Sequence, residues 1–155
     1  MNKIEEIASV HLGKAGDGSV VNPYITPDRI DASLLVGIPR HLNRTQYNIE
    51  EDNLPFEGTD SWNGYEFSCL LDNGFPVCGQ VRWDYNSDSA NIVESKSAKL
   101  YLNSYNMMML GPTVKEAISN AEDQIAEDMA SVLGLKDKFD TVSYTHLTLP
   151  TTPYV

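Results

Sequence analysis

The sequence predicts an α+β fold in which an antiparallel sheet carries a helix packed on one face. Three observations predict it: a hairpin turn at 72–74, alternating side chains in the strands beside that turn, and an amphipathic helical pattern around residue 120. The chain has 155 residues, of which 41% are hydrophobic and 21% charged. This length is typical of a single domain, and the hydrophobic fraction is sufficient for a buried core.

Residues 1–60 are rich in turn formers and show little periodicity. A short apolar stretch, 34–38, ends at Pro39, and the segments 53–56 and 58–60 have the composition of ordered loops. We expect much of this part of the chain to wrap around the core.

A hairpin is expected next. The turn Asp72-Asn73-Gly74 separates strands expected at 65–71 and 77–85, because Asn-Gly accepts positive φ at low cost. The second strand alternates between an apolar face and a polar face, namely Val77, Val81, Trp83 and Tyr85 against Cys78, Gln80, Arg82 and Asp84. A third strand is expected over 92–105, where apolar side chains alternate with others: Ala98, Leu100 and Leu102 against Lys99, Tyr101 and Asn103.

The best helical pattern covers 114–133. Thr113 is a suitable N-cap, Glu116 completes a capping box, and Gly134 is a natural stop. One apolar stripe follows the helical period: Val114, Ile118, Ala121, Ile125, Met129 and Val132. The acidic residues are expected on the solvated side: Glu122, Asp123, Glu127 and Asp128.

Residues 141–155 differ from the rest of the chain. All 33 charged side chains lie within 1–140, and five of the last fifteen residues are threonine. The string from Val142 to Thr152 resembles the translation of a transposase-type sequencing adapter. We therefore expect a module over 1–140, whose natural chain was cut near Asp140, and an artefactual tail over 141–155. The alternative is a threonine-rich edge strand, and the tail with His146 is left out of functional reasoning.

The charge balance excludes several function classes. With 22 acidic and 11 basic residues the formal net charge is −11, which disfavours binding to nucleic acid or to an anionic membrane surface. No apolar run approaches the roughly 20 residues of a membrane span. The first ten residues contain Glu5 and Glu6 and no long apolar core, so no secretory signal is expected. Cys69 and Cys78 are then expected to be reduced thiols in the cytoplasm.

Common catalytic motifs are missing from the sequence. It contains neither a Gly-Lys-Ser/Thr phosphate loop nor a Gly-x-Gly-x-x-Gly turn. His11 and His41 lie far apart without metal-ligand spacing, so no metal site is predicted. Cys69 and Cys78 have no compelling base or cation beside them, which favours small buried side chains over nucleophiles.

The most unusual segment runs from Val93 to Tyr101, where a carboxylate, two hydroxyls and two ammonium groups fall within six residues. In a strand, Glu94, Lys96 and Ala98 would share one face. One interpretation is an edge strand protected by lysines. The other is a polar ligand site in which Glu94 accepts paired N–H groups of a heterocycle and Lys96 meets a phosphate. The residue pattern alone gives the two similar weight.

The run Glu94-Ser95-Lys96-Ser97, one further residue, and Lys99-Leu100-Tyr101 resembles the signature of a known family. This is the family of NADPH-dependent nitrile reductases that act on 7-cyano-7-deazaguanine in queuosine biosynthesis, a tRNA-modification pathway. Four flanking segments resemble the N-terminal half of its long, two-module form: 31–35, 39–44, 52–56 and 102–104. The resemblance covers roughly residues 12–135, with five matching segments along that stretch.

The resemblance implies a tunnelling fold (T-fold), in which two modules, each an antiparallel sheet with helices on one side, form a barrel-like assembly. Substrate sites then lie between modules or subunits. The implied reaction reduces the nitrile to 7-aminomethyl-7-deazaguanine: a cysteine thiolate adds to the nitrile, an aspartate shuttles protons, and NADPH supplies two hydrides.

The resemblance also implies site residues. Val93, Glu94 and Ser95 match substrate-contacting positions, and Ser95 and Lys96 match cofactor-contacting positions. Three signature residues are left without a role: Ser97, Lys99 and Tyr101.

The sequence departs from the two-module pattern in its catalytic residues. In that form the cysteine and aspartate belong to the C-terminal module, and neither Cys69 nor Cys78 matches by spacing; a downstream His-Glu substrate pair is also absent. No catalytic residue is therefore assigned. The first hypothesis is an N-terminal half, inactive alone, of a reductase that includes a missing C-terminal module and is a homodimer when complete. The second is a non-catalytic module that binds a deazapurine or a separate catalytic subunit. Another T-fold activity, on pterins or purines, is a distant third.

Overall fold

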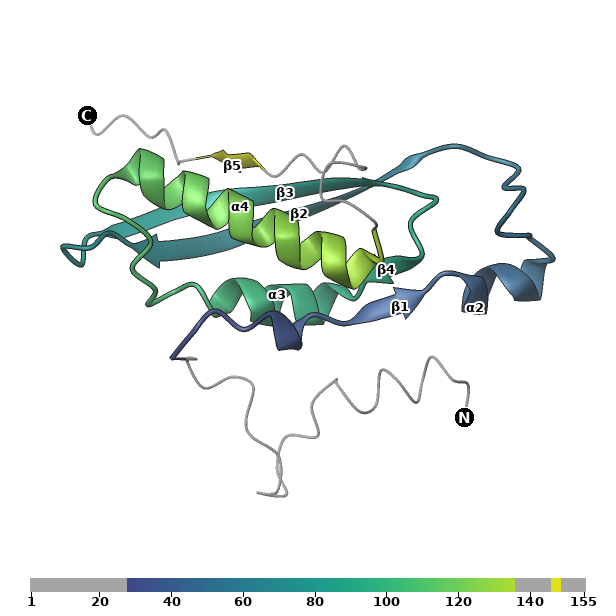
Figure 1. Ribbon diagram of the computed structural model, residues 1–155, viewed down its shortest axis with the longest axis horizontal. Coiled ribbons are helices and arrows are strands. Elements are labelled where there is room, and N and C mark those ends of the chain that lie inside the picture. The colour runs from purple at the N-terminus through teal and green to yellow at the C-terminus, as the bar shows by residue number, and fades with distance from the viewer. Residues whose placement is uncertain (1–27, 136–145, 149–155) are drawn as a thin grey trace, which may run out of the picture.

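The computed structural model describes residues 28–135 and 146–148 (Figure 1). Expectations for residues 1–27, which include His11, and for 136–145 and 149–155 lie outside the described residues.

A long antiparallel hairpin is the centre of the fold. Strands β2 (Thr59–Leu70) and β3 (Pro76–Asn86) pair from end to end, with one register shift between Gly64 and Phe67. The predicted turn is confirmed, because Gly74 has a φ of 80° and Oδ1 of Asn73 accepts the N–H of Phe75 at 2.9 Å. The predicted faces of β3 are also confirmed, since its apolar residues are buried and its polar residues point outward.

The expected start of β2 at residue 65 is wrong. The strand begins at Thr59, so part of the segment expected as ordered loop belongs to the sheet. The reason is a cross-strand pair: Trp62 lies opposite Trp83, and their rings stack with centroids 4.2 Å apart. Aromatic cross-strand pairs of this kind stabilise a sheet.

The segment before β2 forms a second, small sheet and two short helical elements. Strand β1 (Gly37–Pro39) pairs antiparallel with β4 (Asn91–Val93). Around β1 lie η1 (Ala32–Leu34), α2 (His41–Arg44) and η2 (Thr45–Tyr47). The buried Arg44 donates to Glu51 at 2.7 Å and to the carbonyl oxygen of Ser87, which ties this segment to the end of β3. The described part of residues 1–60 thus wraps the core as expected.

Helix α4 (Val114–Leu133) has the predicted bounds and caps. The N–H of Glu116 donates to Oγ1 of Thr113 at 3.3 Å, and Gly134 ends the helix with a φ of 74°. One detail of the solvated acidic side is wrong: Asp128 accepts a hydrogen bond from the buried hydroxyl of Tyr101 at 2.6 Å.

The third strand expected over 92–105 is wrong. Only Asn91–Val93 is extended, and residues Ser95–Asn103 form helix α3. Its buried side chains Ala98, Tyr101 and Leu102 recur at helical spacing, and the buried Tyr105 follows just after the helix. Two helices, rather than the single one expected, therefore pack on the hairpin, and the α+β prediction with helices on an antiparallel sheet is confirmed (Figure 1).

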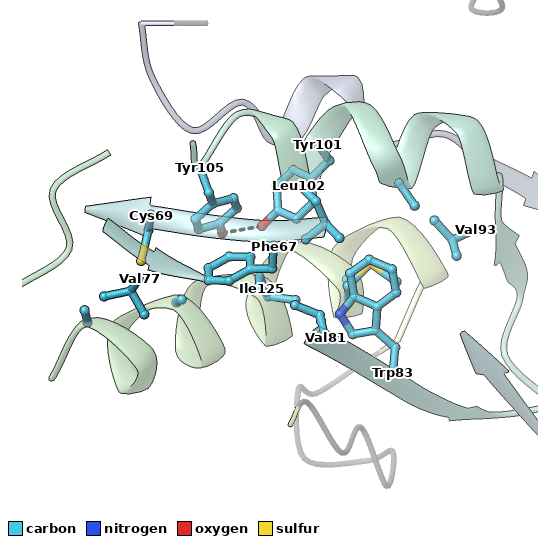
Figure 2. Packing of buried hydrophobic residues seen from close by; sticks show 14 of the residues in the cluster. Phe67, Cys69, Val77, Val81, Trp83, Val93, Tyr101, Leu102, Tyr105 and Ile125 are labelled. Carbon is cyan, nitrogen blue, oxygen red and sulfur yellow. Dashed lines mark hydrogen bonds between the residues drawn. The ribbon is translucent and has the colours of Figure 1, made fainter. Parts of the chain in front are cut away.

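One continuous core joins the hairpin to both helices. Figure 2 shows Phe67, Val81 and Trp83 of the hairpin packed against Tyr101 of α3 and Ile125 of α4. The buried face of α3 thus holds this helix against the hairpin and α4.

Strand β5 (His146–Thr148) pairs antiparallel with Gln80–Arg82 and extends the sheet to the order β2-β3-β5. This is the geometry of the alternative interpretation, an edge strand. Within 28–135 and 146–148, no helix has the length and hydropathy needed to cross a membrane.

Candidate ligand site at the start of helix α3

The signature begins where strand β4 turns into helix α3. Val93 is buried and lies opposite Gly37 in the small sheet, and its N–H donates to the hydroxyl oxygen of Tyr85 at 3.5 Å. Glu94 has extended backbone angles, φ −76° and ψ 127°, and is the N-cap of α3. The Glu94 backbone is thus held between the end of β4 and the start of α3.

The Glu94 carboxylate caps the helix with both oxygens. Oε1 accepts the N–H of Lys96 at 3.0 Å, and Oε2 accepts the N–H of Ser97 at 2.7 Å. A carboxylate has about four lone-pair positions, so each oxygen keeps one for a further donor. Glu94 is half-buried and lies at the N-terminal end of α3, where the backbone N–H groups point toward it.

Ser95 and Lys96 begin the helix with exposed side chains, whereas Ser97 is buried. The expected shared strand face of Glu94, Lys96 and Ala98 is wrong, because residues two apart lie on different sides of a helix. The exposed side of α3 instead carries Ser95, Lys96 and Lys99, which are neighbours at helical spacing.

Two signature residues that the sequence left without a role have structural partners. The hydroxyl of Ser97 donates to the Glu94 carbonyl oxygen at 2.7 Å and accepts the N–H of Val36 at 3.0 Å. Tyr101 donates to Asp128 and accepts from Tyr105, whose hydroxyl lies 2.7 Å away. The chain Tyr105–Tyr101–Asp128 is called the tyrosine relay below. Burial raises the pKa of both tyrosines above the ordinary range, so they are neutral donors.

The two cysteines lie away from Glu94. Figure 2 shows Cys69 at the far end of α3 from Val93, and nine helical residues span about 13 Å at 1.5 Å each. Cys69 is fully buried, and burial raises the pKa of its thiol to about 11, which confirms the expected small buried side chain. Cys78 is exposed, contrary to that expectation, and lies on the outer face of β3 because its neighbour Val77 points into the core.

A cavity of about 210 Å³ lies between β2 and the C-terminal half of α3. Trp62, Tyr65, Lys99 and Leu102 line it together with neighbouring polar residues. Lys99 of the signature therefore borders a hollow near the opposite end of the helix from Glu94. Among the described residues no cluster of three or more His, Cys, Asp and Glu side chains is arranged to hold a metal ion. His41 is exposed on the short helix α2.

The comparison with known proteins decides the family. The family described as nitrile reductase, 7-cyano-7-deazaguanine-reductase N-term, matches residues 26–138. The chain belongs to this family. Its signature is therefore the segment that forms the cap, the exposed start and the buried face of α3.

The curated relatives carry the same description. The chain is 47% identical over 109 residues to the NADPH-dependent 7-cyano-7-deazaguanine reductase of Rickettsia canadensis (strain McKiel), covering 70% of this chain and 38% of the relative. It is 46% identical to the protein of the same name in Rickettsia felis (strain ATCC VR-1525 / URRWXCal2), with 70% and 38% covered. For Rickettsia prowazekii (strain Madrid E) the identity is 47%, with 68% and 37% covered. The chain thus spans little more than a third of the length of these relatives.

Proposed function

We propose that this chain is the N-terminal module of an NADPH-dependent 7-cyano-7-deazaguanine reductase. In the complete protein Val93, Glu94 and Ser95 contact the substrate, and Ser95 and Lys96 contact the cofactor. The observation that supports this most directly is the capped Glu94 carboxylate, whose orientation is fixed by two backbone bonds before any ligand arrives. An oriented acceptor loses less free energy in ordering when it binds.

The chemistry of Glu94 matches a deazaguanine edge. A ring N–H and an adjacent exocyclic amine present two parallel donors, and the free lone pairs of Oε1 and Oε2 present two acceptors. Hydrogen bonds to an ionised carboxylate are about twice as strong as neutral ones. The same half-buried carboxylate disfavours ligands that present acceptors at this edge.

The start of α3 also fits a phosphorylated cofactor. The exposed Lys96 ammonium group can meet a phosphate as a point charge, and the exposed Ser95 hydroxyl can donate beside it. NADPH, when bound, supplies the hydrides for reduction of the nitrile to the aminomethyl group. The described residues contribute binding and orientation at this site.

The nucleophile is assigned to the part of the relatives that this chain does not span. Cys69 is inaccessible and its raised pKa keeps it a thiol, and Cys78 lies on the outer face of the sheet. We further propose that residues 1–140 belong to this module and that 141–155 is adapter-derived. Strand β5 pairs with the edge of β3, whereas the core cluster is made of residues before 136. A chain of residues 1–140 is therefore expected to keep the hairpin and both helices.

The test is calorimetric titration of the chain with 7-cyano-7-deazaguanine, followed by mass spectrometry after addition of NADPH. We expect weak binding, about tenfold weaker in Glu94→Gln, because one acceptor becomes a donor and a ligand N–H is left unpaired. We expect no covalent adduct and no NADPH loss. Equal affinity of Glu94→Gln would refute the role of Glu94, and an adduct on Cys69 or Cys78 with turnover would refute the assignment of the nucleophile. Binding by the complete natural protein without any reduction would favour the non-catalytic deazapurine-binding module.

A further inference from the structure

We infer that Ser97 is the positioning residue of Glu94, an inference that rests on the proposed function because it concerns the same carboxylate. Ser97 is 3% exposed, so its hydroxyl does not meet a ligand directly. Its hydroxyl donates to the carbonyl oxygen of Glu94 and accepts the N–H of Val36, whose carbonyl oxygen accepts the N–H of Glu94. It therefore acts on the site through Glu94.

Three hydrogen bonds close a ring around this point. The N–H of Glu94 donates to the carbonyl oxygen of Val36 at 2.9 Å. The N–H of Val36 donates to Oγ of Ser97 at 3.0 Å, and the Ser97 hydroxyl donates back to the Glu94 carbonyl oxygen at 2.7 Å. Removal of this one oxygen breaks two of the three bonds.

The ring and the cap share Ser97. Its backbone N–H holds Oε2 of Glu94, while its side chain holds the Glu94 carbonyl oxygen. The same residue thus restrains the main chain and the carboxylate of Glu94. Without the hydroxyl, the buried N–H of Val36 loses its acceptor, and the bond between the Glu94 N–H and the Val36 carbonyl oxygen is the one bond of the ring that remains. The carboxylate then samples more orientations, and fewer of them present both oxygens to a ligand.

The chain contains a matched control at the other end of the helix. The hydroxyl of Ser104 donates to the carbonyl oxygen of Tyr101 at 2.6 Å and accepts the N–H of Asp31 at 3.2 Å. Ser104 is 1% exposed. It therefore makes the same pair of bonds, to a carbonyl three residues back and to the 31–36 segment, at the far end of α3 from Glu94. Loss of either hydroxyl is expected to destabilise the fold to a similar extent.

The experiment compares Ser97→Ala, Ser104→Ala and Ser97→Thr in the full 155-residue chain. Amide hydrogen exchange by NMR reports the cap at the N–H of Lys96, and calorimetry reports affinity for 7-cyano-7-deazaguanine. For Ser97→Ala we expect roughly fivefold to tenfold faster exchange at Lys96 and a similar fall in affinity, the size expected when one hydrogen bond is lost. For Ser104→Ala we expect faster exchange at Asp31, with Lys96 exchange and affinity unchanged. Ser97→Thr keeps the hydroxyl and is expected to restore both quantities.

The two measurements separate the inference from the proposed function. If the unsubstituted chain does not bind the nitrile, the proposed function fails for this chain, and Lys96 exchange alone then decides whether Ser97 positions the cap. Unchanged exchange at Lys96 in Ser97→Ala overturns the inference. Equal losses of affinity in Ser97→Ala and Ser104→Ala also overturn it, because the effect would then follow general stability. Faster exchange with unchanged affinity shows that the cap is not what the ligand needs, and it refutes the positioning role.

Discussion

The tyrosine relay makes a quantitative prediction about stability. In Tyr101→Phe the fold loses a hydrogen bond of 2.6 Å to the Asp128 carboxylate, and the fully buried hydroxyl of Tyr105 loses its acceptor. A bond to a charged group contributes about 1.5–3 kcal/mol, and an unsatisfied buried donor costs about 1–3 kcal/mol. Asp128 is half-buried, so water recovers part of the first contribution. We therefore expect a loss of about 3 kcal/mol in the free energy of unfolding.

The double variant makes this prediction specific. Tyr105→Phe removes a neutral hydrogen bond and leaves no orphaned donor, so about 1 kcal/mol is expected. Tyr101→Phe combined with Tyr105→Phe removes the orphaned hydroxyl, and its cost is expected to be at least about 1 kcal/mol below the sum of the single costs. Guanidinium unfolding of the full chain, followed by the fluorescence of the stacked Trp62 and Trp83, measures all three. Simple additivity, or a loss below about 0.5 kcal/mol for Tyr101→Phe, would refute the relay.

Two further expectations concern packing and pH. A Cβ at Gly64 would lie 2.6 Å from Cδ1 of Leu102, so Gly64→Ala is expected to lower the free energy of unfolding by about 1–3 kcal/mol through overpacking. Gly58→Ala is the control, because its Cβ would have its nearest neighbour 3.8 Å away. Equal unfolding midpoints of the two variants would contradict the steric argument. Tyr101 and Tyr105 have raised pKa values in the folded chain. Their contribution to stability is therefore complete below the unfolded tyrosine pKa near about 10 and is lost as the pH rises above it. The expected loss in the free energy of unfolding is about 1.4 kcal/mol per pH unit for each tyrosine. Unfolding titrations between pH 8 and pH 11, roughly the range around that pKa, measure this, and a flat profile would contradict it.

The parts of the fold that were predictable from sequence are those with local signals. Helix α4 has its N-cap Thr113, its apolar stripe and its terminal Gly134 within one segment of chain. The hairpin has Asn73 and Gly74 at its turn. Each of these signals acts over a few residues, so no knowledge of distant contacts is needed to interpret it.

Helix α3 was missed because its sequence satisfies two periods at once. Alternation over residues 98–103 suggested a strand, yet Ala98, Tyr101, Leu102 and Tyr105 also follow the helical spacing i, i+3, i+4 and i+7. Distant contacts decide between them. The N–H of Val36, 61 positions away, meets the Ser97 hydroxyl, and Asp128, 27 positions away, meets Tyr101. The signature residues of the site were identified by resemblance, whereas their geometry and the role of Ser97 required the structure.

Because the signature begins a helix rather than a strand, its polar groups Glu94, Ser95 and Lys96 are arranged differently from the arrangement expected from sequence. Because the Glu94 carboxylate accepts the N–H groups of Lys96 and Ser97, those amides are not available to a phosphate, although a helix N-terminus would otherwise attract one. Under the proposed function, recognition of a phosphate would then depend on the Lys96 ammonium group and the Ser95 hydroxyl, which are exposed in the first turn. Under the proposed function, the cap divides the junction between two chemistries: Glu94 would accept from a donor-rich ring, and Lys96 beside it would meet a phosphate. A strand would have placed Glu94 and Lys96 on one face, whereas the start of the helix holds the Glu94 carboxylate on two backbone N–H groups and leaves the Lys96 side chain exposed.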